Sequence, residues 1–158
     1  MKLIQALSVI FLVLFIAGCQ VQVENNVGNS NGFNQGGDIN LGEGDLKGAK
    51  GYYEVTIDRA KELIDENPDI IILDVSPPTM YAEEHIPEAL NYYLQGDTFE
   101  KDIAKLDREK LYLVYCKSTV SSVSAAENMA DIGFENVYRL VSEFQAWKNA
   151  GYKTEKGN

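Results

Sequence analysis

Short apolar runs and stretches of helical periodicity alternate over residues 50–158. Five of the runs are typical of β-strands, and they lie at residues 52–55, 70–75, 91–94, 111–115 and 137–140. The runs at 70–75 and 111–115 are almost continuously apolar, as in strands that are buried on both faces of a parallel sheet. The pattern predicts an α/β fold with a central, mostly parallel five-stranded sheet flanked by helices.

Apolar stripes at helical spacing fill the gaps between these runs. Thr56 is a plausible N-cap for a helix after the first run, and Ser121 or Ser122 for a helix after the fourth. Gly133 fits the position just past the end of that second helix. Further helices are predicted near residues 99–106 and 144–150, whereas the proline pair at 77–78 predicts a loop. In such a fold the ligand site lies at the carboxyl ends of the strands.

The N-terminus has the features of a targeting segment. An almost wholly apolar run at 3–16 follows a single lysine, and it is shorter than the roughly 20 residues that a membrane span needs. The sequence Ile16-Ala17-Gly18-Cys19 resembles a bacterial lipoprotein signal. That resemblance implies removal of residues 1–18 and attachment of lipid, such as palmitate, to Cys19. An uncleaved anchor or an ordinary signal peptide are the alternatives, and each also places the domain outside the cytoplasm.

Residues 19–49 are rich in asparagine and glycine and show no periodicity. Such a segment buries too little apolar surface to offset the entropy of ordering it. We therefore expect a lipidated Cys19 followed by a flexible linker, and a single folded domain at residues 50–158. The linker would hold this domain away from the extracytoplasmic face of the cell membrane.

The charge of the chain narrows the possible partners. The formal net charge is −10 at pH 7, from 24 acidic and 14 basic residues. An acidic chain without a basic patch argues against nucleic acid as a partner. The hydrophobic content of 45% is ordinary for a globular fold, so the domain has a core of its own.

Cys116 is the candidate for chemistry. If Cys19 carries lipid, Cys116 is the only remaining thiol, so no intramolecular disulfide can form. It follows a predicted strand and precedes a short polar loop and a helix start. Loop N–H groups and the positive end of a helix stabilise a thiolate or another anionic sulfur. The alternative is a buried cysteine that behaves as a small apolar residue.

Four blocks of the chain resemble the rhodanese-like sulfurtransferase family. They span about residues 53–152, and they are Ile72-Leu73-Asp74-Val75, Tyr81-Ala82-Glu83-Glu84-His85-Ile86-Pro87-Glu88-Ala89, Val114-Tyr115-Cys116 with its polar loop, and Gly133 to Leu140 with the segments at 144–147 and 151–152. The resemblance implies that Cys116 attacks the outer sulfur of a donor, becomes a persulfide, and passes this sulfur to a thiol or protein acceptor. It implies no metal and no organic cofactor.

The substrate-binding residues carried over by this resemblance are those of the loop that follows the cysteine. They are Lys117, Ser118, Thr119, Val120 and Ser121, whose N–H groups would hold the persulfide anion. Lys117, Thr119 and Ser121 stand where active members of the family have arginine, glycine and arginine. Glutamates at 84 and 88 replace two further glycines, and Ser76 replaces an arginine. With fewer cations and nearby carboxylates, we expect poor use of the thiosulfate dianion and better use of persulfides.

Two other function classes stay open beside the sulfurtransferase. One is a rhodanese-like module that has lost catalysis and binds a partner protein. The other is a phosphatase or arsenate reductase of related fold, which needs an arginine at the place of Ser122 and is therefore disfavoured. We expect structural roles for His85 and Asp74, and core positions for the aromatic residues at 144 and 147.

Overall fold

The computed structural model describes residues 47–157. The elements of this part are, in chain order, β1 (Tyr53–Val55), α1 (Ile57–Glu66), β2 (Ile71–Asp74), α2 (Pro78–Glu83), β3 (Leu90–Asn91), α3 (Phe99–Ile103), β4 (Leu111–Tyr115), α4 (Thr119–Asp131), β5 (Asn136–Leu140) and α5 (Phe144–Asn149). The predicted strands and the alternation with helices are confirmed. The expected signal peptide, Cys19 and most of the expected linker lie outside the described residues.

The five strands form one parallel sheet in the order β1-β5-β4-β2-β3. The continuously apolar β4 is buried along its whole length between β2 and β5. Its side chains alternate between the two faces of the sheet, as the period of a strand requires. Tyr112, Val114 and Cys116 belong to one apolar cluster, and Leu113 and Tyr115 belong to the other.

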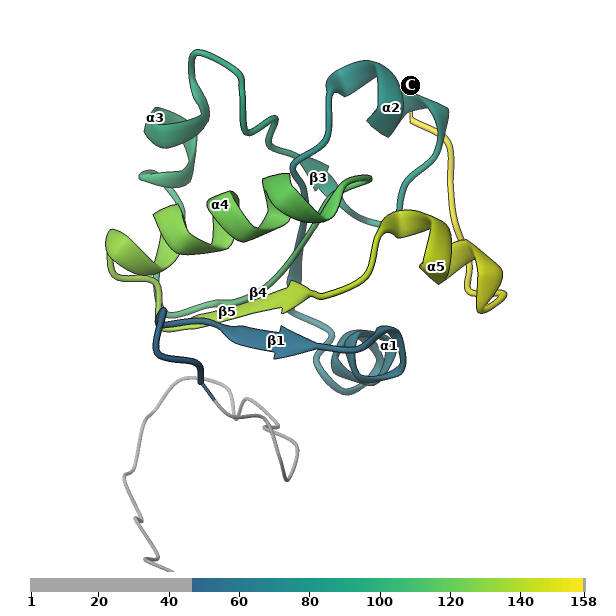
Figure 1. The fold of residues 1–158 in the computed structure, drawn as a ribbon, viewed down its shortest axis with the longest axis horizontal. Helices are drawn as coiled ribbons and strands as arrows, with labels where there is room; N and C mark the ends of the chain where they lie inside the picture. The colour runs from purple at the N-terminus through teal and green to yellow at the C-terminus, as the bar shows by residue number, and fades with distance from the viewer. Residues whose placement is uncertain (1–46, 158) are drawn as a thin grey trace, which may run out of the picture. The chain divides into compact units, whose positions relative to one another are not determined.

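Helices cover both faces of this sheet (Figure 1). On one face, α4 contributes Ala125, Ala126 and Met129 to the cluster that includes Cys116. The α3 residues Phe99 and Ile103 belong to the same cluster. On the other face, α1 and α5 supply the corresponding apolar side chains, among them the predicted core residues at 144 and 147. The fold thus presents Cys116 on the face that α4 covers.

Three local predictions are corrected by the structure. The proline pair does not form the predicted loop: Pro77 is the N-cap residue of α2, and Pro78 lies in its first turn. Proline is tolerated there because an N–H in the first turn has no partner within the helix. The third strand is Leu90–Asn91 rather than 91–94. Helix α4 begins at Thr119 with Ser118 as its N-cap residue, so neither Ser121 nor Ser122 caps it.

Candidate active site

Cys116 directly follows the carboxyl end of β4, at the edge of the sheet where ligands bind in open α/β folds. In the register of the sheet, Asp74 of β2 pairs with Tyr115, so the end of β2 lies beside the thiol. The Cys116 residue is only 3% exposed. It nevertheless lines a pocket of about 230 Å³. The other lining residues are Pro77, Met80, Tyr93, Gln95, Lys117, Ser118 and Ser121.

Ser76 supplies the most direct polar contact to the thiol. Its Oγ lies 3.4 Å from Cys116 Sγ and accepts the N–H of Lys117 at 2.9 Å. A hydroxyl has one hydrogen, and because the Lys117 amide occupies Oγ as an acceptor, that hydrogen is available to the sulfur. Ser76 is fully buried, so this contact is shielded from water. The hydroxyl is placed to stabilise an anionic sulfur on Cys116.

Asp74 fixes the position of Ser76. One carboxylate oxygen of Asp74, Oδ1, accepts the N–H of Ser76 at 2.8 Å. Asn91 then donates its side-chain amide to the carbonyl oxygens of Asp74 and Ser76, both at 2.9 Å. Burial raises the pKa of the neighbouring Tyr115 hydroxyl far above its ordinary value, and the Asp74 carboxylate raises it further. The expected structural role of Asp74 is thus what the contacts show.

The start of α4 faces the same pocket. Ser118 Oγ lies 3.8 Å from Cys116 Sγ, and Ser121 Oγ lies 3.4 Å from Ser118 Oγ. The first turn of a helix leaves N–H groups without partners in the helix, and its dipole is positive there. Thr119 and Val120 are not among the lining residues of the described chain. The side chain of Val120 is 77% exposed, so only its backbone could serve the site.

Lys117 lines the pocket, but its ammonium group is bound by other groups of the protein. The Nζ atom donates to the Met80 carbonyl oxygen at 2.5 Å and lies 4.9 Å from the centroid of the Phe144 ring. The Lys117 N–H, which the sequence suggested as a donor to sulfur, instead donates to Ser76. The one cationic side chain among the lining residues of the described chain is therefore already partnered.

The carboxylates expected near the thiol lie outside the pocket itself. None of the pocket's lining residues in the described part of the chain is acidic. Glu84 instead forms an ion pair with Lys148 and accepts the Thr154 hydroxyl, both of which lower its pKa, and it is close enough to Lys117 for the lysine charge to lower that pKa further. Glu88 adopts a backbone φ of 64° in the turn that follows His85.

A buried arginine lies behind the first turn of α4. Arg139 of β5 pairs with Val114 in the sheet, two residues before Cys116, and is 5% exposed. Its guanidinium donates to the Ser122 hydroxyl at 3.5 Å and pairs with Glu54 at 2.5 Å. Ser122 in turn donates to the Thr119 carbonyl oxygen at 2.9 Å. A positive charge thus contacts the helix turn that faces the thiol pocket.

His85 has the structural role that was expected. Its backbone N–H donates to the Glu155 carbonyl oxygen, and its carbonyl oxygen accepts the Glu155 N–H. Its ring stacks on that of Tyr81, with centroids 3.9 Å apart. The ring nitrogens contact the Tyr81 carbonyl oxygen and the Glu155 carboxylate. These contacts join the C-terminal segment to the residues that follow α2, and Figure 1 shows that segment running beside this helix. His85 is not one of the residues that line the thiol pocket.

Residues 47–157 contain neither a metal-binding cluster nor a helix suited to a membrane. No group of three or more histidine, cysteine, aspartate or glutamate side chains in this range is arranged to hold a metal ion. Within the same range, no helix combines the length and apolar character that crossing a membrane requires.

Residues 56–150 match the family model described as the rhodanese-like domain. The chain therefore belongs to the rhodanese-like domain family. A relative named thiosulfate sulfurtransferase GlpE, from Coxiella burnetii (strain RSA 331 / Henzerling II), is 37% identical over 107 residues, which cover 68% of this chain and 96% of the relative. A relative of the same name from Actinobacillus pleuropneumoniae serotype 5b (strain L20) is 28% identical and covers 66% and 94%.

Solved structures agree on the fold. The crystal structure of the Alr3790 protein from Anabaena sp. has a TM-score of 0.60 at 24% identity, with coverage of 65% of this chain and 92% of that chain. The crystal structure of the BH2092 protein from Bacillus halodurans has a TM-score of 0.57 at 27% identity, with coverage of 67% and 77%. The five-stranded parallel sheet flanked by helices is thus shared with these proteins.

The sequence identifies Cys116 and the loop that follows it as the candidate site, but it does not identify two residues that support them, Ser76 and Arg139. Ser76 was noticed only as the replacement of an arginine, although its place at the end of a predicted central strand was a usable signal. Arg139 gave no such signal, because its contact with Ser122 joins two elements that meet only in the folded chain.

Proposed function

We propose that this protein is a sulfurtransferase that carries sulfane sulfur as a persulfide on Cys116. The observation that supports this most is the position of the thiol: it lines a pocket at the carboxyl end of β4, 3.4 Å from a buried hydroxyl. The family membership and the relatives named thiosulfate sulfurtransferase support the same reaction class.

The reaction is a transfer between sulfur atoms. The Cys116 thiolate attacks the outer sulfur of the donor, a Cys116–sulfur bond forms, and the donor's own sulfur–sulfur bond breaks. The electron pair of that bond leaves with the rest of the donor, as sulfite from thiosulfate or as a thiolate from a persulfide. An acceptor thiolate then attacks the outer sulfur of the Cys116 persulfide and regenerates the Cys116 thiolate. The Ser76 hydroxyl and the start of α4 stabilise the anionic sulfur in both forms.

The electrostatics of the pocket favour a donor of low charge. The only lining cation of the described residues, Lys117, is bound to the Met80 carbonyl oxygen and lies against Phe144. A dianion such as thiosulfate would have to enter without a free cationic partner, which is costly in a partly buried site. The persulfide group itself carries a single negative charge at most, so persulfides are the proposed donors.

The proposal also includes the location of the domain. The sequence around Cys19 supports a lipoprotein whose residues 1–18 are removed and whose linker, up to residue 49, holds the domain outside the cell membrane. Growth with labelled palmitate tests it: label should enter the protein and disappear in the Cys19→Ser variant. Label that stays in this variant, or never enters the natural chain, would contradict the anchor.

Mass spectrometry of the full chain in detergent tests the transfer reaction. After a persulfide donor is added, the protein should gain the mass of one sulfur on Cys116, and a thiol or cyanide should remove it. The Cys116→Ala variant should not transfer sulfur, whereas Cys19→Ser, which changes the other cysteine of the chain, should transfer it normally. Transfer by folded Cys116→Ala would overturn the proposal. A folded natural chain that gains no sulfur from any donor would instead indicate a protein-binding module.

A further inference from the structure

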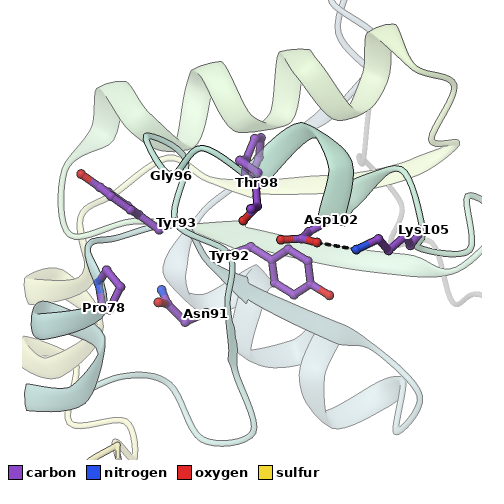
Figure 2. A pocket seen from close by; sticks show the side chains of 9 residues that line it. Pro78, Asn91, Tyr92, Tyr93, Gly96, Thr98, Asp102 and Lys105 are labelled. Carbon is purple, nitrogen blue, oxygen red and sulfur yellow. Dashed lines mark hydrogen bonds and ion pairs between the residues drawn. The ribbon is translucent and has the colours of Figure 1, made fainter.

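A second, larger pocket adjoins the pocket of Cys116. Its volume is about 590 Å³, and Tyr93 lines both pockets. The adjacent prolines of the 77–78 pair each line one of them, Pro77 the thiol pocket and Pro78 the larger pocket. Figure 2 shows Pro78, Asn91 and Tyr93 at one end of the larger pocket, and Asp102 with Lys105 at the other. The two pockets therefore lie side by side along the segment that follows β3.

The two volumes suit different parts of one substrate. Pockets that enclose an organic ligand usually measure about 300–1,000 Å³. The thiol pocket, at about 230 Å³, is below this range and suits a reacting sulfur with its nearest atoms. The neighbouring pocket, at about 590 Å³, is within the range. It has room for the body of a molecule whose sulfur enters beside Cys116.

The lining of the larger pocket offers both signs of charge beside aromatic surface. Lys105 Nζ and Asp102 Oδ1 are 2.7 Å apart, and their side chains are 72% and 39% exposed. In Figure 2 the ring of Tyr92 lies next to this ion pair. An exposed pair of this kind contributes little to stability, so a ligand can replace it with two pairs of its own at small cost. A ligand with a carboxylate and an ammonium group would match Lys105 and Asp102.

The larger pocket is also connected to the thiol through hydrogen bonds. Asn91 lines it and donates to the carbonyl oxygens of Asp74 and Ser76, both at 2.9 Å. Ser76 then contacts Cys116 Sγ through its hydroxyl. A molecule in the larger pocket would therefore contact Asn91, the residue that orients Ser76 beside the reacting sulfur.

We infer that the larger pocket binds the body of a zwitterionic, low-molecular-mass persulfide or thiol, an amino acid or short peptide in class. This inference rests on the proposed function and specifies its substrate. Lys105 binds the carboxylate of the molecule, and Asp102 binds its ammonium group. Tyr93, which lines both pockets, lies between this part of the molecule and its reacting sulfur beside Cys116. The Cys116 thiolate attacks the outer sulfur of the bound persulfide: a bond forms between Cys116 Sγ and that sulfur, and the sulfur–sulfur bond of the donor breaks. The electron pair of the broken bond and the proton leave together on the inner sulfur, as the free thiol.

Donor kinetics on the full chain test the pocket. Glutathione persulfide is the zwitterionic probe and inorganic polysulfide is the probe without a body. Lys105→Met should lower sulfur transfer from glutathione persulfide about tenfold, the loss of one charge-assisted contact, and leave transfer from polysulfide unchanged. The matched control is Lys101→Met, which removes the same charge from an exposed residue of α3 that does not line the pocket. An equal effect of Lys105→Met on both donors, or no effect on either, would overturn the inference.

A binding measurement separates this inference from the proposed reaction. In the Cys116→Ser background, reduced glutathione should bind by calorimetry, and adding Asp102→Asn or Lys105→Met should weaken it about tenfold. Absence of binding, or binding that neither substitution weakens, overturns the pocket assignment even if Cys116 carries sulfur. If no donor adds sulfur to Cys116, the proposed reaction fails, while this binding measurement still decides the pocket.

Discussion

The thiol loop after β4 and the strap formed by residues 81–89 with Glu155 depart from the family pattern in different ways. In the strap, glutamates replace two glycines, and the fold accommodates both. Glu84 pairs with Lys148 and Thr154. Glu88 takes a left-handed φ of 64°, and its N–H donates to the Glu155 carboxylate at 2.9 Å. A non-glycine residue in that region costs about 1 kcal/mol, and the hydrogen bond from its N–H, which a glycine would also form, holds the turn against Glu155.

In the thiol loop the departures remove charge instead of adding contacts. Ser121 stands where the family pattern has an arginine, and its hydroxyl reaches only Ser118 Oγ, at 3.4 Å. Arg139 brings a positive charge to α4 through its contact with the Ser122 hydroxyl, but it is not among the residues that line the pocket in the described chain. The comparison teaches that replacements in the strap preserve the frame, whereas replacements in the loop remove cationic side chains that could pair with an anionic donor.

The largest effect is expected from restoring a cation to the loop. Ser121→Arg should raise kcat/KM for thiosulfate by about tenfold or more, because a guanidinium in the pocket can pair with the dianion. Val120→Arg is the matched control, since it adds the same charge one residue away on a side chain that is 77% exposed. An unchanged rate in Ser121→Arg, or an equal gain in both variants, would show that charge in the pocket does not limit the use of thiosulfate.

The next largest effect should come from Ser76, whose hydroxyl contacts Cys116 Sγ and accepts the N–H of Lys117 at the start of the loop. Ser76→Ala removes a hydroxyl beside the sulfur and leaves the half-buried Lys117 N–H without its acceptor, at a cost of about 1 kcal/mol. We expect sulfur transfer from a persulfide donor to fall about tenfold. Ser118→Ala, whose Oγ lies 3.8 Å from Sγ on an exposed residue, should lower it less. Equal losses in the two variants would contradict the assignment.

A smaller effect should reveal the charge of Arg139 at the thiol. Arg139→Met removes a buried cation that contacts the start of α4, so the rate of sulfur transfer from a persulfide donor should fall, by about threefold. Glu54→Gln leaves the cation without its counter-ion, so the same rate should rise. A purely structural role would move both variants in one direction or neither. Thermal unfolding of each variant checks that the fold is kept.

The order of strands and helices in this fold could be predicted because each of the predicted elements is marked by a local pattern of apolar residues or by a glycine at its end. The runs that became β2 and β4 are apolar because both faces of the sheet are covered, and Cys116 follows directly from the end of β4. Helix α2 was missed because proline is read as a breaker, although it is favourable in a first helical turn.

The environment of the thiol could be predicted only in part. The Ser76 hydroxyl and the Cys116 sulfur are 40 positions apart in the chain, and the register of β2 with β4 brings them together. The larger pocket combines side chains from the segment after β3 with others from α3, and no local pattern marks them as neighbours. Such contacts depend on packing between distant segments, which periodicity does not encode.

The smallest effect is expected in the strap, from the titration of Glu84. Lys148 and Thr154 hold the pKa of this carboxyl below its ordinary value of 4.5. The ionised form is therefore favoured in the folded state, and its contribution to stability is present above pH 4.5 and is lost as the pH falls through the folded pKa. Glu84→Gln should remove that part of the acid sensitivity and lower the free energy of unfolding slightly at neutral pH.

Denaturant titrations between pH 3 and pH 7 measure this effect, with Glu83→Gln as the control. Glu83 is the adjacent, exposed glutamate, and its substitution should leave the pH dependence of unfolding as it is. A change of equal size in the two variants would mean that the Lys148 and Thr154 contacts do not stabilise the strap. If only Glu84→Gln responds while its sulfur transfer is unchanged, the two regions have separate roles: the strap glutamate supports the frame and takes no part in the choice of donor.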